Sequence, residues 1–125
     1  MKYLMDTHTL IWYFKQKDRF SDEVKFEILN PGNAIYISIA SLWEIAIKIS
    51  INKIELDLEE LITKSENTGF VFLPVKKEYI QKIVGMPFIH RDPFDRIIIA
   101  TSVIEKIPII TADQHIQKYD ISWIW

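Results

Sequence analysis

The sequence predicts an α/β fold in which a small parallel sheet lies between two layers of helices. Short apolar runs such as Tyr3 to Met5 and Ala34 to Ile37 alternate along the chain with longer helix-like segments, which is typical of a parallel sheet. The first run does not alternate apolar with polar residues, which indicates a strand covered on both faces. Asp6 follows this run directly, at the edge where open parallel sheets bind their ligands.

The other elements are expected in the following order. In the first half of the chain, strands are expected at 34–37 and 70–73 and helices at 8–14, 21–29, 39–51 and 58–67. The second helix has a clear start at Ser21 and a clear stop at Asn30-Pro31-Gly32. In the second half, helices are expected at 76–84 and 94–106 and strands at 109–111 and 121–125. Pro74 and Pro108 mark breaks between these elements.

The composition fits one folded, soluble domain over residues 1–125. Hydrophobic residues make up 49% of the chain and charged residues 26%, as in globular proteins. We expect no signal peptide and no membrane span, because no apolar run approaches the roughly 20 residues that a bilayer requires. The chain has no cysteine, which excludes thiolate chemistry and suits a reducing cytoplasm.

The net charge of −2 does not exclude a nucleic-acid substrate. The chain has 17 acidic and 15 basic residues, which on its own argues against a basic binding surface. If four acids hold a cation, however, 17 − 4 = 13 acids remain against 15 bases. The cation then neutralises the acids around it.

Four acidic residues attract attention by their positions, and each also has a purely structural interpretation. Asp6 and Asp113 each follow a strand, and each also suits a helix cap or a turn. Glu44 lies on an apolar helix that we expect to be buried, in one polar stripe with Ser41 and Lys48. Its alternatives are a capping box with Ser41 and an ion pair with Lys48.

Asp92 and Asp95 surround the start of the next helix. Pro93 at the first helical position makes Asp92 the natural N-cap. Asp95 then lies in the first turn, where a carboxylate also favours the helix dipole. We assign Asp92 to the cap and Asp95 to chemistry, because the apolar run after Asp95 must face the sheet.

Taken together, Asp6, Glu44, Asp95 and Asp113 predict a metal site at one edge of the sheet. Crowded carboxylates repel one another unless a cation is present. Hard oxygen ligands suit Mg²⁺ or Mn²⁺, which keep waters for a phosphate and a nucleophile. The chemistry that needs such a site is metal-assisted hydrolysis of a phosphodiester bond.

These segments resemble the PIN-domain proteins of the VapC-like kind, which are ribonuclease toxins of type II toxin–antitoxin systems. The resemblance covers essentially the whole chain. It is carried by four segments: Leu4-Met5-Asp6-Thr7-His8, the run from Ser38 to Lys48, His90-Arg91-Asp92-Pro93-Phe94-Asp95-Arg96 and Thr111-Ala112-Asp113.

The resemblance implies an α/β/α sandwich and a Mg²⁺- or Mn²⁺-dependent endoribonuclease. It places the metal-binding and catalytic acids at Asp6, Glu44, Asp95 and Asp113, with Thr7 and Thr111 as supporting hydroxyls. It further implies an RNA substrate, a homodimer and a cognate antitoxin protein that blocks the acid site.

Several other residues have two interpretations. Arg91 and Arg96 are candidates for contacts with substrate phosphates, or else they form surface ion pairs. His8 and His90 are candidates for general acid–base catalysis, but a histidine at a helix start or in a loop is more often solvated, and we prefer that interpretation. The aromatic run Ile11-Trp12-Tyr13-Phe14 is assigned to the core, although an exposed part would mark an interface.

Three other functions would use some of the same residues. A haloacid-dehalogenase-like phosphatase also begins with an Asp after its first strand, but it needs a second Asp where this chain has His8. A non-catalytic module that only binds RNA or protein would use the acids as caps and would bind no metal. A housekeeping nuclease would keep the metal site but act on DNA or on an RNA in maturation.

Overall fold

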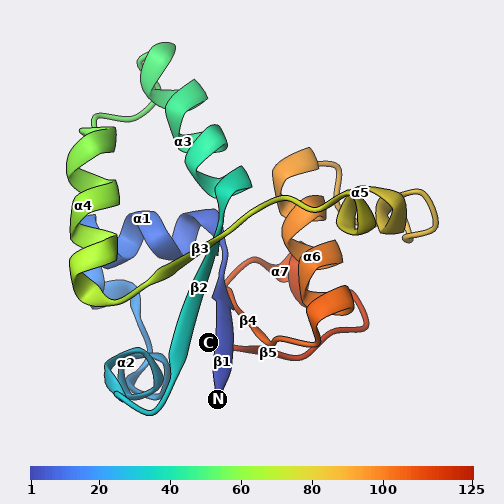
Figure 1. Cartoon of the computed structure of the whole chain (residues 1–125), viewed down its shortest axis with the longest axis horizontal. Helices are drawn as coiled ribbons and strands as arrows, with labels where there is room; N and C mark the ends of the chain where they lie inside the picture. The colour runs from blue at the N-terminus through green and yellow to red at the C-terminus, as the bar shows by residue number, and fades with distance from the viewer.

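A computed structural model describes all 125 residues of the chain. Its centre is a sheet of five parallel strands in the order β3-β2-β1-β4-β5 (Figure 1). The strands are β1 (Lys2–Met5), β2 (Ala34–Ser38), β3 (Val71–Leu73), β4 (Ile109–Ile110) and β5 (Trp123–Ile124). Met5 lies opposite Ile37 of β2 on one side and Ile110 of β4 on the other. The predicted parallel sheet is therefore confirmed, with β1 at its centre.

Seven α-helices connect and cover the strands. They are α1 (Thr7–Lys15), α2 (Asp22–Leu29), α3 (Ile39–Ser50), α4 (Leu58–Thr68), α5 (Lys77–Ile83), α6 (Pro93–Glu105) and α7 (Gln114–Gln117). A turn of 3₁₀ helix, η1 (Lys17–Arg19), follows α1. All the predicted helices are present, whereas α7 was not predicted. Four residues are too few to give a recognisable apolar period.

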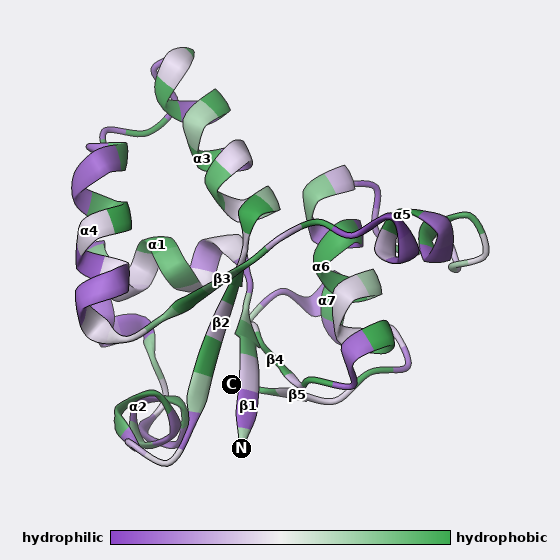
Figure 2. Cartoon of the chain, in the orientation of Figure 1, coloured by the Kyte–Doolittle hydropathy of each residue, from purple (hydrophilic) through white to green (hydrophobic).

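Successive residues of β1 point to opposite faces of the sheet, and each face has its own core. Tyr3 and Met5 pack in a cluster with side chains from α1, α2, α3 and α4, whereas Leu4 packs with side chains from α6 and α7. Figure 1 shows these two groups of helices on opposite sides of the strands. In Figure 2, hydrophobic residues extend along β2 into α3, while α4 is mostly hydrophilic. The fold is thus the predicted three-layer α/β/α sandwich.

The aromatic end of α1 belongs to the first core. Ile11 is buried, and the three aromatic residues after it are partly buried and pack against the same cluster. Trp12 meets Trp125 edge to face with ring centroids 5.6 Å apart. Core packing is therefore the correct interpretation of this run.

The expectation that α3 is buried holds for only one of its faces. Ile39, Trp43 and Ile47 are among the exposed large hydrophobic residues of the chain. They recur every four residues and so form one stripe along the helix. The opposite side, which carries Ser41, Glu44 and Ile45, is buried. Because the sequence of α3 is apolar on almost every side, it did not show which face would be buried and which exposed.

The order of the strands indicates where a ligand site is expected. The chain runs from β1 outward to β2 and β3, and then returns to the other side of β1 for β4 and β5. The direction of the connections therefore reverses between β1 and β4. In open α/β sheets, ligands bind at such a switch point, beyond the carboxyl ends of the strands. Asp6 follows β1 and Thr111 follows β4 at this point.

None of the helices combines the length and the apolar character that a membrane span requires.

Candidate metal centre

Asp6 and Asp113 are linked through Thr111 at the ends of two neighbouring strands. The Thr111 hydroxyl donates a hydrogen bond to Oδ2 of Asp6 and accepts one, at 3.0 Å, from the backbone N–H of Asp113. Oδ1 of Asp6 accepts from the N–H of Thr9 at 2.8 Å and so caps α1. Oδ1 of Asp113 caps α7 in the same way. Both acids are thus helix caps, and both also face the switch point.

Glu44 reaches the same region from α3. The N-cap of α3 is Ser38, so the capping box between Ser41 and Glu44 does not form. The Ser41 hydroxyl instead accepts a hydrogen bond from Oγ1 of Thr7 at 3.0 Å, which ties α3 to the start of α1. Glu44 is only 4% exposed. Its Oε2 lies 3.0 Å from Nζ of Lys48, while its Oε1 is buried without a partner.

Asp95 lies in the first turn of α6, where Asp92 is the N-cap. Oδ1 of Asp92 accepts from the N–H groups of Phe94 and Asp95, each at 2.9 Å. Asp95 is 4% exposed and directs its side chain toward the other acids. Carboxylate oxygens of Glu44, Asp92 and Asp95 lie within 4.8 Å of one another. The assignment of Asp92 to the cap is confirmed.

The environment of Asp95 strongly disfavours its charged form. Burial raises the pKa of Asp95 to about 8, and the negative charges of Asp92, Asp6, Glu44 and Asp113 add to the effect. Burial also raises the pKa of Asp6, although hydrogen bonds from Thr111 and Thr9 oppose this change. A raised carboxyl pKa among like charges is expected where a cation is needed to complete the site.

His90 is part of this cluster, and its side chain is only 14% exposed, so the interpretation of His90 as a solvated residue is wrong. Its Nε2 lies 2.8 Å from Oδ2 of Asp95 and 3.4 Å from Oδ2 of Asp113. One ligand atom from each of these three residues lies within 4.8 Å of the other two. His8, by contrast, is exposed, and it lines a cavity of about 230 Å³ together with Asp6 and Asp113.

The two arginines beside the acids differ in their surroundings. Arg91 is exposed, so its predicted contact with a phosphate stays a prediction. Arg96 is only 8% exposed, and its guanidinium donates to the carbonyls of Ile83, Pro87 and His90. Arg96 follows Asp95 by one residue, which turns it about 100° around the helix and away from the acids. These contacts give Arg96 a structural role, and its predicted contact with a substrate phosphate stays a prediction.

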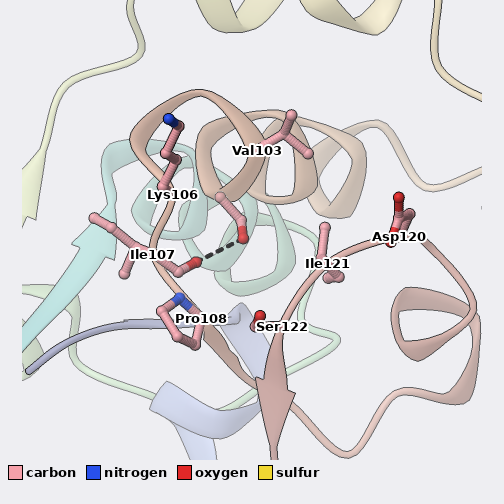
Figure 3. A pocket seen from close by; sticks show the side chains of 8 residues that line it. Val103, Lys106, Ile107, Pro108, Asp120, Ile121 and Ser122 are labelled. Atoms are coloured by element: carbon pink, nitrogen blue, oxygen red, sulfur yellow. Dashed lines mark hydrogen bonds between the residues drawn. The ribbon is translucent and has the colours of Figure 1, made fainter.

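A larger cavity lies elsewhere and does not compete with this site. Figure 3 shows this cavity, of about 360 Å³, at the C-terminal end of α6, lined among others by Ser102, Pro108 and Asp120. The hydroxyl of Ser102 donates to the carbonyl of Ile107 at 2.6 Å, which helps to end the helix. Asp120 is the only acidic residue in the lining, so the cavity has no group of carboxylates.

Comparisons with known proteins agree with this geometry. The family model of the PIN domain matches residues 3–122. The chain belongs to the PIN domain family. No match was found among curated protein sequences.

Solved structures share the whole PIN fold with this chain. A VapBC2 complex from Rickettsia felis, bound to a DNA fragment from its promoter, aligns with a TM-score of 0.74 and 15% identity, over 99% of this chain and 98% of the other. A DNA-bound VapBC from Salmonella typhimurium gives a TM-score of 0.70 and 17% identity, over 99% and 97%. A toxin–antitoxin complex from Klebsiella pneumoniae gives 0.68 and 19%, over 98% and 96%.

The residues of this PIN domain fit a divalent cation. Carboxylate oxygens of Glu44, Asp92 and Asp95 form one group, and those of Asp95 and Asp113 form a second group with His90. Hard cations such as Mg²⁺ and Mn²⁺ prefer such oxygen ligands. The unpartnered Oε1 of Glu44 is a buried acceptor that a cation would satisfy. Both oxygens of Asp6 already accept one hydrogen bond, from Thr9 and from Thr111, and each keeps a further lone pair for a cation or a water.

Proposed function

We propose that this PIN-domain protein is a Mg²⁺- or Mn²⁺-dependent endoribonuclease and the toxin of a type II toxin–antitoxin pair. The observation that supports the proposal most strongly is the surroundings of Asp95. This carboxyl group is buried, and its pKa is raised to about 8 among the negative charges of Asp92, Asp6, Glu44 and Asp113. A set of helix caps has no need of such crowding, whereas a metal-dependent nuclease requires it.

The acids divide into two kinds in this proposal. Glu44 and Asp95 have the buried carboxylates that hold the cation, and Asp113 supports it or a second one from the end of β4. Asp6 holds the cation directly or through a bound water, and the hydrogen bonds from Thr9 and Thr111 orient its two oxygens. Thr7 and Thr111 hold the neighbouring elements in place by their hydroxyl bonds.

When bound, a divalent cation would lower the pKa of a water molecule and neutralise charge on a phosphate. The residues of the chain would determine where that reaction takes place. The carboxylates fix where a phosphodiester must lie, at the edge of the sheet between α3, α6 and α7. Arg91 is exposed beside this edge and is suited to contact the backbone of an RNA.

The partners are part of the same proposal. The similar solved structures are complexes of VapBC or toxin–antitoxin proteins, which supports a cognate antitoxin for this chain. We expect a homodimer in the cytoplasm, with residues 1–125 as one domain. Sedimentation equilibrium tests the dimer, and co-purification with the protein encoded beside it tests the antitoxin.

The decisive experiment for the activity is cleavage of a labelled RNA by the purified protein. The reaction is run with Mn²⁺, with Mg²⁺ and with excess EDTA, and a DNA of the same sequence runs in parallel. Asp95→Asn is the inactivating variant. Asp57→Asn is the matched control, because Asp57 is an exposed N-cap of α4 and asparagine caps equally well.

The proposal predicts cleavage of RNA that EDTA and Asp95→Asn abolish and that Asp57→Asn leaves unchanged. Cleavage of DNA alone would favour the housekeeping nuclease. Binding of RNA without cleavage or metal uptake would favour the binding module. Either of these results would overturn the proposal.

A further inference from the structure

The loop between α5 and α6 is held by a buried network that does not involve the acids directly. The hydroxyl of Tyr119 donates to the carbonyl of Pro87 at 2.8 Å and accepts from the N–H of His90 at 2.9 Å and of Ile89 at 3.2 Å. Arg96 donates to the carbonyls of Pro87 and His90 and to the hydroxyl of Tyr119. Tyr119 is 7% exposed and Arg96 8%. Two buried side chains thus fix the backbone on both sides of His90.

This network presents the imidazole of His90 to two of the acids. Nε2 lies 2.8 Å from Oδ2 of Asp95 in α6 and 3.4 Å from Oδ2 of Asp113 after β4. Nδ1 faces the backbone N–H of Asp92 at 3.4 Å and accepts from it. The hydrogen bond at one ring nitrogen decides which nitrogen carries the proton. The N–H of His90 is therefore on Nε2, between the two carboxylates.

The Nε2 atom is buried, and its N–H does not point at either oxygen closely enough to form an aligned hydrogen bond. The N–H at Nε2 is therefore attracted electrostatically to both carboxylates and forms a hydrogen bond with neither. Without it, Asp95 and Asp113 would face each other with no donor between them. In metal sites, donors behind the ligating carboxylates orient these ligands and affect the binding of the metal.

We infer that His90 is a positioning residue, which holds the carboxylates of Asp95 and Asp113 toward one another, and that Tyr119 and Arg96 fix the loop that presents it. The inference rests on the proposed metal site and adds a role that the four acids do not account for. His90 acts through Asp95 and Asp113 and is not itself a ligand of the cation. The ring of His115, with its centroid 5.2 Å from that of His90, covers its other side.

Calorimetric titration with Mn²⁺ tests the first part of the inference on the full-length chain. His90→Ala should weaken Mn²⁺ binding by about tenfold, the lower end of the range for residues behind metal ligands. His90→Gln places an amide N–H at a similar reach and should recover most of the affinity. Asp57→Asn is the control, since Asp57 is an exposed N-cap of α4, and it should bind Mn²⁺ nearly as the native protein does.

A double-mutant cycle tests the second part. Tyr119→Phe should weaken Mn²⁺ binding in the native background but have little further effect in the His90→Ala background, because Tyr119 acts through His90. Tyr79→Phe is its control. Tyr79 donates to Glu105 at 3.0 Å, at the opposite end of α6, so the loss of its hydroxyl should leave Mn²⁺ binding unchanged.

Each outcome decides something. Native affinity in His90→Ala, or no recovery in His90→Gln, would overturn the role of His90 while leaving the metal site intact. Equal losses from Tyr119→Phe in both backgrounds would overturn the role of Tyr119. No Mn²⁺ binding by the native protein would overturn the proposed function and this inference together.

Discussion

Replacing Asp95 with asparagine is expected to make the metal-free protein more stable at pH 8. The pKa of Asp95 is about 8 in the folded protein, against an ordinary value of 3.8. Below pH 3.8 the carboxyl is protonated in both the folded and the unfolded chain, so its burial has no penalty there. As the pH rises toward 8, the unfolded chain releases the proton and the folded chain retains it, so the free energy of unfolding falls.

The upper limit of this loss is roughly 6 kcal/mol, since each pKa unit corresponds to about 1.36 kcal/mol. Asparagine carries no charge and removes the penalty, but it also weakens the contact with His90. We therefore expect a gain of roughly 1 to 3 kcal/mol at pH 8, within the usual range for single substitutions. Near pH 4 the native carboxyl is itself neutral, so most of this gain should disappear.

The assay is urea unfolding of native protein, Asp95→Asn and the control Asp57→Asn, in EDTA, at pH 8 and near pH 4. Mn²⁺ then provides a second comparison at pH 8. A concentration of 100 times its Kd should stabilise the native protein by about 2.7 kcal/mol and Asp95→Asn by much less. If Asp95→Asn is less stable than native protein at pH 8, or if its effect is independent of pH, Asp95 is not crowded by like charges.

Three further substitutions test the structure around the site. Thr111→Val removes the donor to the buried carboxylate of Asp6 and should lower the free energy of unfolding by roughly 1 to 3 kcal/mol; an unchanged urea midpoint would contradict the bond. Asp92→Ala should lose about 1 kcal/mol, whereas Asp92→Ser should retain the cap of α6, and equal losses would show that capping is not its role. Arg96→Met should lower the free energy of unfolding by roughly 3 kcal/mol, since several buried carbonyls lose a charged donor. A stable Arg96→Met protein with impaired RNA binding would support the predicted contact of Arg96 with a phosphate.

The sequence was sufficient for all the elements except α7 and the short turn η1, because the signals of the other elements are local. Proline, glycine and capping residues mark most helix ends, and the apolar runs mark the strands. Most of the structural alternatives for the acids were also correct, the exception being the capping box of Ser41 and Glu44. Asp6, Asp92 and Asp113 are all N-caps. A cap uses one carboxylate oxygen, as Oδ1 of Asp113 does, and leaves the other for a different contact. The two interpretations are therefore compatible.

What the sequence could not provide depends on contacts between distant residues. The order of the strands is set by packing across the whole chain, and it alone brings the ends of β1 and β4 together. His90 reaches Asp113 only because a loop fixed by Tyr119 holds it there, and Tyr119 lies 29 residues further along the chain. Arg96 directly follows Asp95 in the sequence, but its guanidinium bonds to the carbonyls of Ile83, Pro87 and His90, which the sequence did not indicate.

The most direct test of the account is anomalous diffraction from crystals of the protein soaked in Mn²⁺. The account predicts a manganese peak among the carboxylates of Glu44, Asp95 and Asp113, close enough to Asp95 for direct coordination, and no peak there in Asp95→Asn crystals. A fully soaked native crystal with no manganese at this edge of the sheet, or with manganese bound only elsewhere, would contradict it.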